Sequence, residues 1–253
     1  MESYIRDKFV GSLLWAIIGD ALGWPNEQNS NRIKNNAKEI DSNNFVNWEK
    51  RCGGRFYPYM DRIEAGSYSD DGQLLISTAR SLVSSNEWFT CFTRIELPFW
   101  LLYERGGGGA TLRASKHWLE GKSPWESEDK EKYFNAGGNG AAMRILPHVI
   151  YNIDDEMEGM TQVFMNSITT HGNPRAILGS LLYSKALYYL FKANETIKYG
   201  ELIDYLIETK DNWSIVPQVD RLESWNRAVD SVYKGKYIEL WNKTVDETIN
   251  LLY

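Results

Sequence analysis

Apolar residues recur at helical spacing along most of this 253-residue chain. In the first such segment they occupy the positions that share one face of a helix, namely Val10, Leu13, Leu14, Ile17, Ile18 and Ala21. The same periodicity predicts further helices over residues 70–82, 89–103, 111–119, 159–170, 174–193, 199–209, 219–233 and 236–252. Strand-like alternation is nearly absent, so the predicted fold class is all-α.

Two segments interrupt this helical pattern near the N-terminus. The stretch Gly23-Trp24-Pro25-Asn26-Glu27 is predicted to end the first helix, because proline disfavours helical geometry in the residue before it. Residues 28–66 are polar, rich in Asn and predicted to form a long irregular loop. Loops of that length are usually functional or mobile.

Length and charge limit the possible classes of protein. A chain of 253 residues is at the upper edge of what one core serves, so a single domain over residues 1–253 is predicted. The net charge is −6 and no block of Lys and Arg occurs, which argues against a nucleic-acid partner. No secretory signal or membrane-spanning stretch is visible, and Cys52 and Cys91 are expected to be reduced thiols. We therefore expect a cytoplasmic protein without membrane contact.

Ten Trp and fifteen Tyr residues are more than a chain of this kind needs. Buried aromatic side chains usually pack in the core, and this is the favoured interpretation. The alternative is that some of them form flat walls around a ring-bearing ligand.

An acidic cluster begins the helix predicted over residues 70–82. Ser69 fits a helix N-cap, and Asp70 and Asp71 suit the positive end of the helix dipole, so a structural role alone could explain all three. The functional interpretation is that the hydroxyl and the two carboxylates bind Mg²⁺ or a similar ion, which prefers oxygen ligands. Glu27 is either a solvated acid or a base or ligand beside such a metal. Asp20 is expected to cap or brace a neighbouring element.

Two glycine clusters precede predicted helices. Gly106, Gly107, Gly108 and Gly109 leave backbone N–H groups unobstructed, which suits a phosphate, although a flexible linker is the plain alternative. The run lacks the Gly-Lys-Ser/Thr of a Walker loop and no strand precedes it. The second cluster, Gly137-Gly138-Asn139-Gly140, marks a place where the backbone passes close to another group. His171 follows a predicted helix, and a lone histidine is more often structural than catalytic.

Taken in order, these segments resemble the ADP-ribosylglycohydrolase family. The matching stretches are Gly11 to Glu27, Tyr68-Ser69-Asp70-Asp71-Gly72-Gln73, Arg105 to Thr111, Gly138 to Arg144, and Thr170-His171. Each stretch is weak alone, but five in the family's order and at its spacings are specific.

The resemblance implies a compact, orthogonal multi-helix bundle that holds Mg²⁺ or Mn²⁺ beside ADP-ribose. Ser69, Asp70 and Asp71 fall on metal-ligand positions, and Glu27 on the glutamate that assists the metal and the scissile ribose. The remaining matches are expected to contact ligand: Gly106 to Gly109 at the diphosphate, Gly137, Gly138, Asn139 and Gly140 at the ribose, and Met143 and His171 beside them. The implied reaction is metal-assisted hydrolysis at the anomeric carbon of ADP-ribose.

The sequence departs from the family pattern in two places. Gly72 stands where many relatives have Thr, which loosens the start of the helix. No late Asp-x-Asp-Thr segment, which completes the family's metal site, occurs, so the chain is expected to be one element short at its C-terminus. Acids that could replace the missing ligands are Asp204, Asp211, Asp220, Asp230 and Asp246.

Three hypotheses follow from the incomplete motif set. The first is a hydrolase that removes ADP-ribose from a modified target. The second is a non-catalytic module that binds ADP-ribose or a nucleotide, or one half of a split enzyme completed by a partner chain. The third is an interaction protein with a vestigial site, which the retained acids and glycines disfavour. An uncovered final helix predicts a partner chain or self-association through the C-terminal helices.

Overall fold

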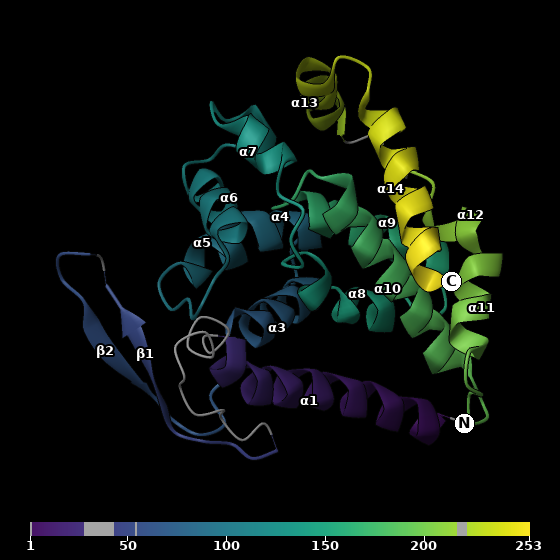
Figure 1. The fold of residues 1–253 in the computed structure, drawn as a ribbon, viewed down its shortest axis with the longest axis horizontal. Helices are drawn as coiled ribbons and strands as arrows, with labels where there is room; N and C mark the ends of the chain where they lie inside the picture. The colour runs from purple at the N-terminus through teal and green to yellow at the C-terminus, as the bar shows by residue number, and fades with distance from the viewer. Residues whose placement is uncertain (1, 28–42, 54, 217–221) are drawn as a thin grey trace. The chain divides into compact units, whose positions relative to one another are not determined.

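The computed structural model describes residues 2–27, 43–53, 55–216 and 222–253. They divide into two compact units, of which the first comprises Met1–Gln73 with Glu104–Gly106 and the second comprises Leu74–Tyr103 with Gly107–Tyr253. Helices make up most of the described structure, and the β-structure in these ranges is one two-stranded sheet (Figure 1). The all-α prediction is confirmed.

Helix α1 spans Glu2–Glu27 and includes Pro25, so the prediction that the segment around this proline breaks the helix is wrong. Proline removes one helical hydrogen bond, and α1 ends two residues later. The last turn is also held by Trp24, which is 2% exposed. Glu27 therefore lies at the end of a helix instead of on a loop.

Strands β1 (Trp48–Cys52) and β2 (Tyr59–Ile63) form an antiparallel hairpin within the segment predicted to be irregular. Trp48 pairs with Ile63, and both side chains are buried with Trp24. The Trp24 and Trp48 rings meet edge to face at 5.2 Å, which fixes the hairpin to the end of α1. The loop prediction is thus wrong at residues 48–52 and 59–63, whereas its part over residues 28–42 lies outside the described residues.

Helix α3 spans Asp70–Leu82, as predicted. The helix predicted over residues 89–103 is continuous but irregular, with α4 (Trp88–Cys91), a π-helical turn (Phe92–Glu96) and α5 (Leu97–Trp100). Helix α6 spans Gly109–Leu119. The later helices are α7 (Lys130–Phe134), α8 (Leu146–Tyr151), α9 (Glu156–Ile168), α10 (Pro174–Lys192), α11 (Glu201–Glu208), α12 (Lys210–Trp213), α13 (Glu223–Tyr233) and α14 (Tyr237–Leu252), with 3₁₀ turns at Pro124–Glu126 and Ala142–Arg144.

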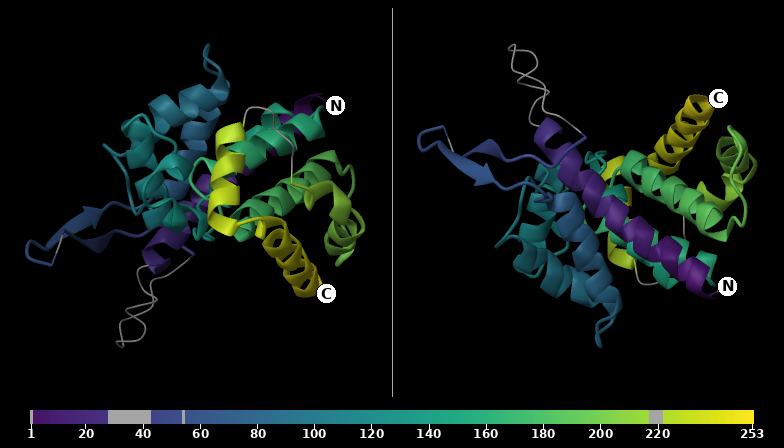
Figure 2. Two further views of the ribbon diagram at one scale, coloured as in Figure 1. Left: turned by 90° about the horizontal axis from the view of Figure 1, so that it is seen from above. Right: turned by 90° about the horizontal axis from the view of Figure 1, so that it is seen from below.

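Helix α10 is the centre of the second unit. It contacts α8, α9, α11, α12 and α14, and Figure 2 shows this group from two further directions. Its buried residues occupy most of its circumference, as expected for a helix surrounded by others.

Aromatic donors hold the segment between α9 and α10. Trp118 Nε1 donates to the carbonyl of Thr169 at 2.8 Å, and the Tyr133 hydroxyl donates to the carbonyl of Ile168 at 2.6 Å. The Tyr237 hydroxyl donates to the carbonyl of Gly172 at 3.1 Å. Because these aromatic side chains are buried, the core interpretation holds for them. Their polar tips fix the backbone on both sides of His171.

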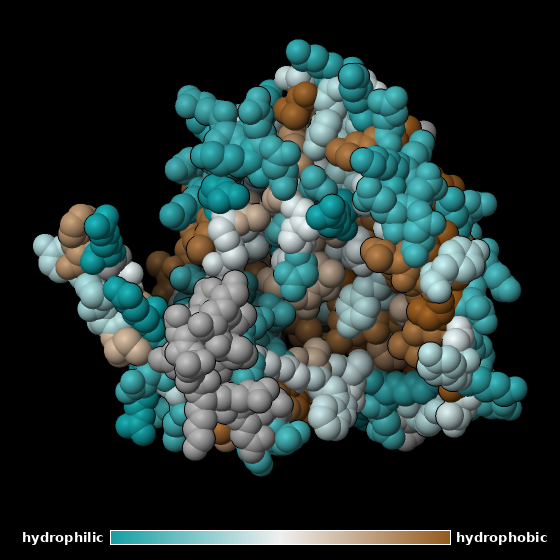
Figure 3. Space-filling view, in the orientation of Figure 1, coloured by the Kyte–Doolittle hydropathy of each residue, from teal (hydrophilic) through white to brown (hydrophobic). Residues whose placement is uncertain are grey.

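Apolar side chains also remain on the surface of the second unit. Figure 3 shows brown atoms where Figure 1 draws α10 and α14. Exposed residues of these helices include Tyr183, Ile238 and Leu251. The expected association through the C-terminal helices stays a prediction. None of the described helices is long and apolar enough to cross a membrane.

Candidate functional site

Asp20 joins α1 to the start of α3 within the first unit. Its Oδ1 accepts a hydrogen bond from the Ser69 hydroxyl at 2.6 Å, and its Oδ2 accepts from the backbone N–H groups of Ser69 at 3.0 Å and Gly72 at 2.7 Å. A Cβ on Gly72 would lie 3.0 Å from Asp20 Oδ2 and 2.7 Å from the Tyr68 ring. Glycine at this position therefore allows the close approach, and the expectation that Asp20 braces a neighbouring element is confirmed.

Four carboxylates gather around this junction. Burial, and then the negative charges of Asp70, Asp20 and Glu27, raise the pKa of Asp71 to about 7. Part of the Glu27 side chain is shielded from water, and this desolvation together with Asp20 raises the pKa of Glu27, whereas Lys50 lowers it. The cluster is therefore a place where negative charge is costly and a cation would be stabilising.

The residues predicted to bind metal offer oxygen donors only. Ser69 is 2% and Asp70 8% exposed. The Ser69 hydroxyl donates to Asp20 and accepts from the Asp71 N–H at 3.3 Å, which leaves one of its two lone pairs for another partner. This donor chemistry fits Mg²⁺ or Mn²⁺. Within the described ranges, however, no group of three His, Cys, Asp or Glu side chains is arranged to hold a metal ion.

The first glycine cluster begins beside the carboxylates. Gly106 has a φ of +83°, and a Cβ there would lie 3.0 Å from Trp24 Nε1 and 3.7 Å from Asp70 Oδ1. The neighbouring Arg105 N–H donates to Gln73 Oε1 at 3.1 Å, which ties the glycine run to the first turn of α3. Glycine is needed here for both its positive φ and its close contact with Trp24.

In the second unit, Gly107 and Gly108 lead into α6, with Gly108 at the N-cap and Gly109 as the first helical residue. No side-chain cap hydrogen bond is made at this end, and the N–H groups of a helix N-terminus favour an anion. Gly137 packs against Asn173, whereas Gly138 and Asn139 are exposed. Met143 is half-buried in the 3₁₀ turn that follows.

Gly140 brings the second glycine cluster against His171. A Cβ on Gly140 would lie 2.9 Å from His171 Cε1, 3.3 Å from His171 Nε2 and 3.1 Å from Thr111 Oγ1. His171 is 2% exposed, and burial followed by the charges of Arg144 and Arg113 lowers its pKa to about 3. The structure thus places a neutral imidazole beside Gly140 and the first turns of α6.

Arg144, which is fully buried, contacts the segments that contain Gly140 and His171. Its guanidinium donates to the carbonyl of Gly140, to Asn166 and to the hydroxyls of Thr169 and Thr170. It also lies over the Phe92 ring, 5.5 Å from the centroid. One side chain therefore connects the second glycine cluster with the segment that carries His171.

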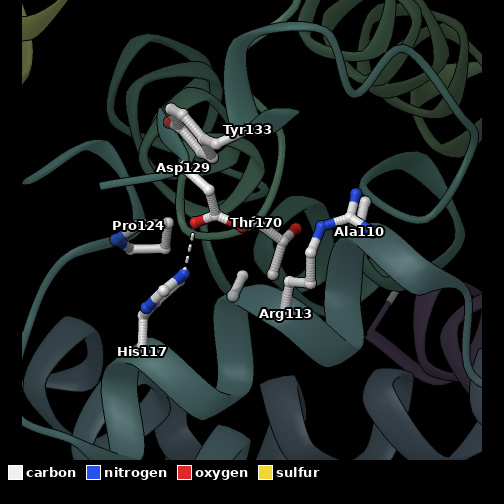
Figure 4. Close-up of a pocket in the computed structure, with 8 residues that line it drawn as sticks. Ala110, Arg113, His117, Pro124, Asp129, Tyr133 and Thr170 are labelled. Atoms are coloured by element: carbon white, nitrogen blue, oxygen red, sulfur yellow. Dashed lines mark hydrogen bonds and ion pairs between the residues drawn. The ribbon is translucent and has the colours of Figure 1, made fainter. Parts of the chain in front are cut away.

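A small pocket opens beside Thr170. It is lined by Ala110, Arg113, Ala114, His117, Pro124, Asp129, Tyr133 and Thr170. Figure 4 shows Arg113 and His117 extending from α6, with His117 Nε2 paired to Asp129 Oδ1 at 2.9 Å. The pocket is too small for a nucleotide, so we assign it no ligand.

The sequence-based candidates fall into two groups. Ser69, Asp70, Asp71, Glu27 and Gly106 belong to the first unit, whereas the other glycines, Asn139, Met143 and His171 belong to the second. Sequence reasoning missed three residues that contact these candidates, namely Thr111, Arg144 and Thr170. All three lie inside or at the edge of the stretches that resemble the family. Their place in those stretches was the sequence feature that could have identified them.

Comparisons with known proteins find similarity to one family. A family model described as ADP-ribosylglycohydrolase matches residues 1–250. The chain is 23% identical over 190 residues to the ADP-ribosyl-(dinitrogen reductase) glycohydrolase of Rhodospirillum rubrum. That match covers 74% of this chain and 58% of the relative, so the chain spans somewhat more than half the length of the curated protein.

Proposed function

Because the chain belongs to the ADP-ribosylglycohydrolase family, we propose that it hydrolyses the glycosidic bond between ADP-ribose and a modified target. The family match and the glycohydrolase activity named for the Rhodospirillum rubrum relative support this class of reaction. The structural observation that carries the proposal is the acid cluster at the start of α3, where burial and three neighbouring carboxylates raise the pKa of Asp71 to about 7.

The cofactor that we assign to this cluster is Mg²⁺ or Mn²⁺. Ser69, Asp70 and Asp71 would hold it, because they are the oxygen donors at the helix N-terminus and the repulsion between the acids favours a cation. Such an ion, when bound, polarises ribose hydroxyls and water.

Glu27 is the general base in this proposal. A carboxylate is an effective base when its pKa approaches the working pH, and desolvation together with Asp20 shifts the Glu27 pKa in that direction. Its carboxylate would take the proton of the attacking water. Asp70 and Asp71 would act at the same centre by holding the cation and orienting the ribose.

The glycine segments and His171 bind the rest of the ligand in this proposal. The uncapped N-terminus of α6 after Gly106–Gly109 suits the diphosphate, because backbone N–H groups and the helix dipole both favour an anion. Residues Gly137–Gly140, Met143 and His171 would surround the ribose, since a Cβ on Gly140 would lie 2.9 Å from His171 Cε1 and Met143 comes shortly after Gly140 in the chain.

The alternative is a non-catalytic module that binds ADP-ribose or a nucleotide, or one half of a split enzyme completed by a partner chain. This alternative does not require a metal group of three acids, and the described residues contain none. A weak or incomplete metal site would leave the binding of ADP-ribose intact without turnover.

Calorimetric titration with ADP-ribose, in Mg²⁺ and again with a chelator, separates these functions. Affinity that falls when the chelator removes Mg²⁺ supports the metal-dependent hydrolase, and the release of free ADP-ribose from an ADP-ribosylated protein would establish the reaction. Affinity that ignores the metal, without release of ADP-ribose, supports the binding module. No binding in either condition contradicts both.

The variants Asp70→Asn and Asp71→Asn test the metal assignment. Each should remove the thermal stabilisation that Mg²⁺ gives the wild-type chain, which is about 1.4 kcal/mol at a metal concentration about ten times Kd. Without metal, Asp71→Asn should be at least as stable as the wild type, because it relieves repulsion among the acids. Asp154→Asn, an exposed acid before α9, is the matched control. Normal Mg²⁺ stabilisation in both test variants would rule out these ligands.

A further inference from the structure

Arg144 makes five described hydrogen bonds that converge on two parts of the candidate site. Nη1 donates to the carbonyl of Gly140. Nε donates to Asn166 Oδ1 at 2.7 Å, while Nη2 donates to the Asn166 carbonyl at 3.0 Å and to the hydroxyls of Thr169 at 3.2 Å and Thr170 at 2.7 Å. A planar guanidinium has its donors in a fixed geometry, so these acceptors are fixed relative to one another.

Thr170 passes this restraint to His171. Its Oγ1 accepts from Arg144 and lies 2.7 Å from His171 Nδ1. The hydroxyl has one hydrogen, and Nδ1 is the acceptor that the described contacts offer it, which favours donation from the hydroxyl to this nitrogen over the reverse direction. His171 Nδ1 is then unprotonated, and the proton of the neutral ring is on Nε2.

The Nε2 edge is the part of the imidazole that faces the second glycine cluster. A Cβ on Gly140 would lie 3.3 Å from Nε2 and 3.1 Å from Thr111 Oγ1. Burial and two nearby arginines keep the ring neutral, with a pKa of about 3. A neutral imidazole protonated on Nε2 presents a hydrogen-bond donor at this edge, and such a donor selects an oxygen acceptor.

We propose that Arg144 and Thr170 are positioning residues that hold His171 as the Nε2–H tautomer, so that it donates a hydrogen bond to an oxygen of the ligand. This inference rests on the proposed function for the identity of the ligand, ADP-ribose. The tautomer itself is a property of the ligand-free chain. Arg144 also fixes His171 relative to Gly140, because its guanidinium binds both the Gly140 carbonyl and the Thr170 hydroxyl that contacts His171 Nδ1.

Long-range ¹H–¹⁵N correlation spectra of the ligand-free, full-length protein test the tautomer directly. The chain has three histidines, so a His171→Gln variant identifies the His171 signals. The expected spectrum shows a protonated Nε2 and an unprotonated Nδ1 for His171. A protonated Nδ1 in the wild type would overturn the proposal.

Substitution at Thr170 tests the relay without removing the buried arginine. Thr170→Val keeps the side-chain shape but loses the hydroxyl, so His171 should populate both tautomers, whereas Thr170→Ser should retain the wild-type spectrum. Thr169→Val is the matched control, because Thr169 also accepts from Arg144 but no hydrogen bond to His171 is described for it. An unchanged tautomer in Thr170→Val, or an equal change in Thr169→Val, would contradict the relay.

Titration of the same variants with ADP-ribose tests whether the His171 tautomer contributes to ligand affinity. Thr170→Val should weaken binding about fivefold to tenfold, while Thr170→Ser and Thr169→Val should stay close to the wild type. Wild-type affinity in Thr170→Val would overturn the positioning role. If the wild-type chain binds no ADP-ribose, the proposed function fails and so does the ligand contact, whereas the ligand-free spectra still decide the tautomer.

Discussion

At the scale of single residues, Gly140 is a tightly constrained position beside His171. Its φ is outside the left-handed region, so backbone strain does not explain the glycine. The reason is space, because His171 Cε1 at 2.9 Å and Thr111 Oγ1 at 3.1 Å surround the point where a Cβ would lie. Both neighbours are buried and the Gly140 carbonyl is bound by Arg144, so none of the three can move easily.

Gly140→Ala should therefore displace the His171 ring. We expect ADP-ribose affinity to fall at least about tenfold and the free energy of unfolding to fall by about 1–3 kcal/mol, the usual cost of overpacking. Calorimetric titration measures the first quantity and urea unfolding the second.

Gly179→Ala is the matched control for this substitution. Gly179 is exposed on α10, and nothing lies within 4 Å of the point that a Cβ would occupy there. Alanine should therefore stabilise the helix by about 0.5–1 kcal/mol and leave affinity unchanged. Equal affinities in Gly140→Ala and the wild type would remove Gly140 and His171 from the ligand site.

How far the sequence predicted these residues depended on local signals. Ser69-Asp70-Asp71 was visible because a helix N-cap and first turn have a recognisable composition, and α3 does begin at Asp70. The role of Arg144 was not visible, because its acceptors at Asn166, Thr169 and Thr170 are more than twenty residues away in the chain. Contacts of that separation depend on packing between helices, which a single sequence does not reveal.

At the scale of elements, Asp20 is the connection between α1 and α3. One carboxylate accepts from the Ser69 hydroxyl, the Ser69 N–H and the Gly72 N–H. It therefore satisfies backbone donors at the start of α3 that would otherwise lack a helical partner. The junction orients the same turn that presents Asp70 and Asp71.

Asp20→Asn should weaken this junction. Asparagine offers one oxygen in place of two and carries no charge, so at least one donor loses its acceptor. We expect the free energy of unfolding to fall by about 1.5–3 kcal/mol in urea titrations. Asp154→Asn, with the same chemical change at an exposed site, should stay within about 0.5 kcal/mol of the wild type. A stable Asp20→Asn variant would mean that water replaces the brace.

The predicted elements were correct where the pattern was long and wrong where tertiary contacts decided. The cores of α3, α9, α10 and α14 follow the helical spacing. Pro25 was taken as a helix breaker, yet Trp24 packs against Trp48 and holds the final turn. The β1–β2 hairpin was missed because the sequences of its strands show no alternation of apolar and polar residues, and only the paired Trp48 and Ile63 are buried.

At the scale of the whole molecule, two buried histidines connect folding stability to pH. His148 is fully buried, with Nδ1 at 3.1 Å from Gln162 Oε1 and Nε2 at 3.1 Å from Asn166 Nδ2, an arrangement that suits the neutral ring. Burial, offset in part by the Gln162 bond, lowers its pKa from 6.5 to about 4. The pKa of His171 falls from 6.5 to about 3.

Both shifts lower the folded-state pKa, so stability should decrease as the solution is acidified. Below about pH 6.5 the unfolded chain binds protons at these histidines, whereas the folded chain stays neutral there until about pH 4 at His148 and about pH 3 at His171. Each histidine should therefore lower the free energy of unfolding by about 1.4 kcal/mol for each pH unit of acidification in this window. Between pH 7 and pH 5 the histidines should lower the free energy of unfolding by about 2 kcal/mol each, or about 4 kcal/mol together, and Asp71, whose folded-state pKa is raised to about 7, should offset about 2 kcal/mol of this loss.

Urea unfolding at several pH values between 7.5 and about 5 measures this slope, and single histidine variants assign it. His148→Gln and His171→Gln should each lose stability at pH 7 but show a decrease toward pH 5 that is about 2 kcal/mol smaller than that of the wild type, because one titrating histidine is absent. Asp71 titrates in the same window with the opposite sign, because its folded-state pKa is raised to about 7, so Asp71→Asn should steepen the decrease by about 2 kcal/mol. An equal decrease in His171→Gln and the wild type would mean that acid reaches this ring in the folded state, and His171 could not then remain a neutral donor.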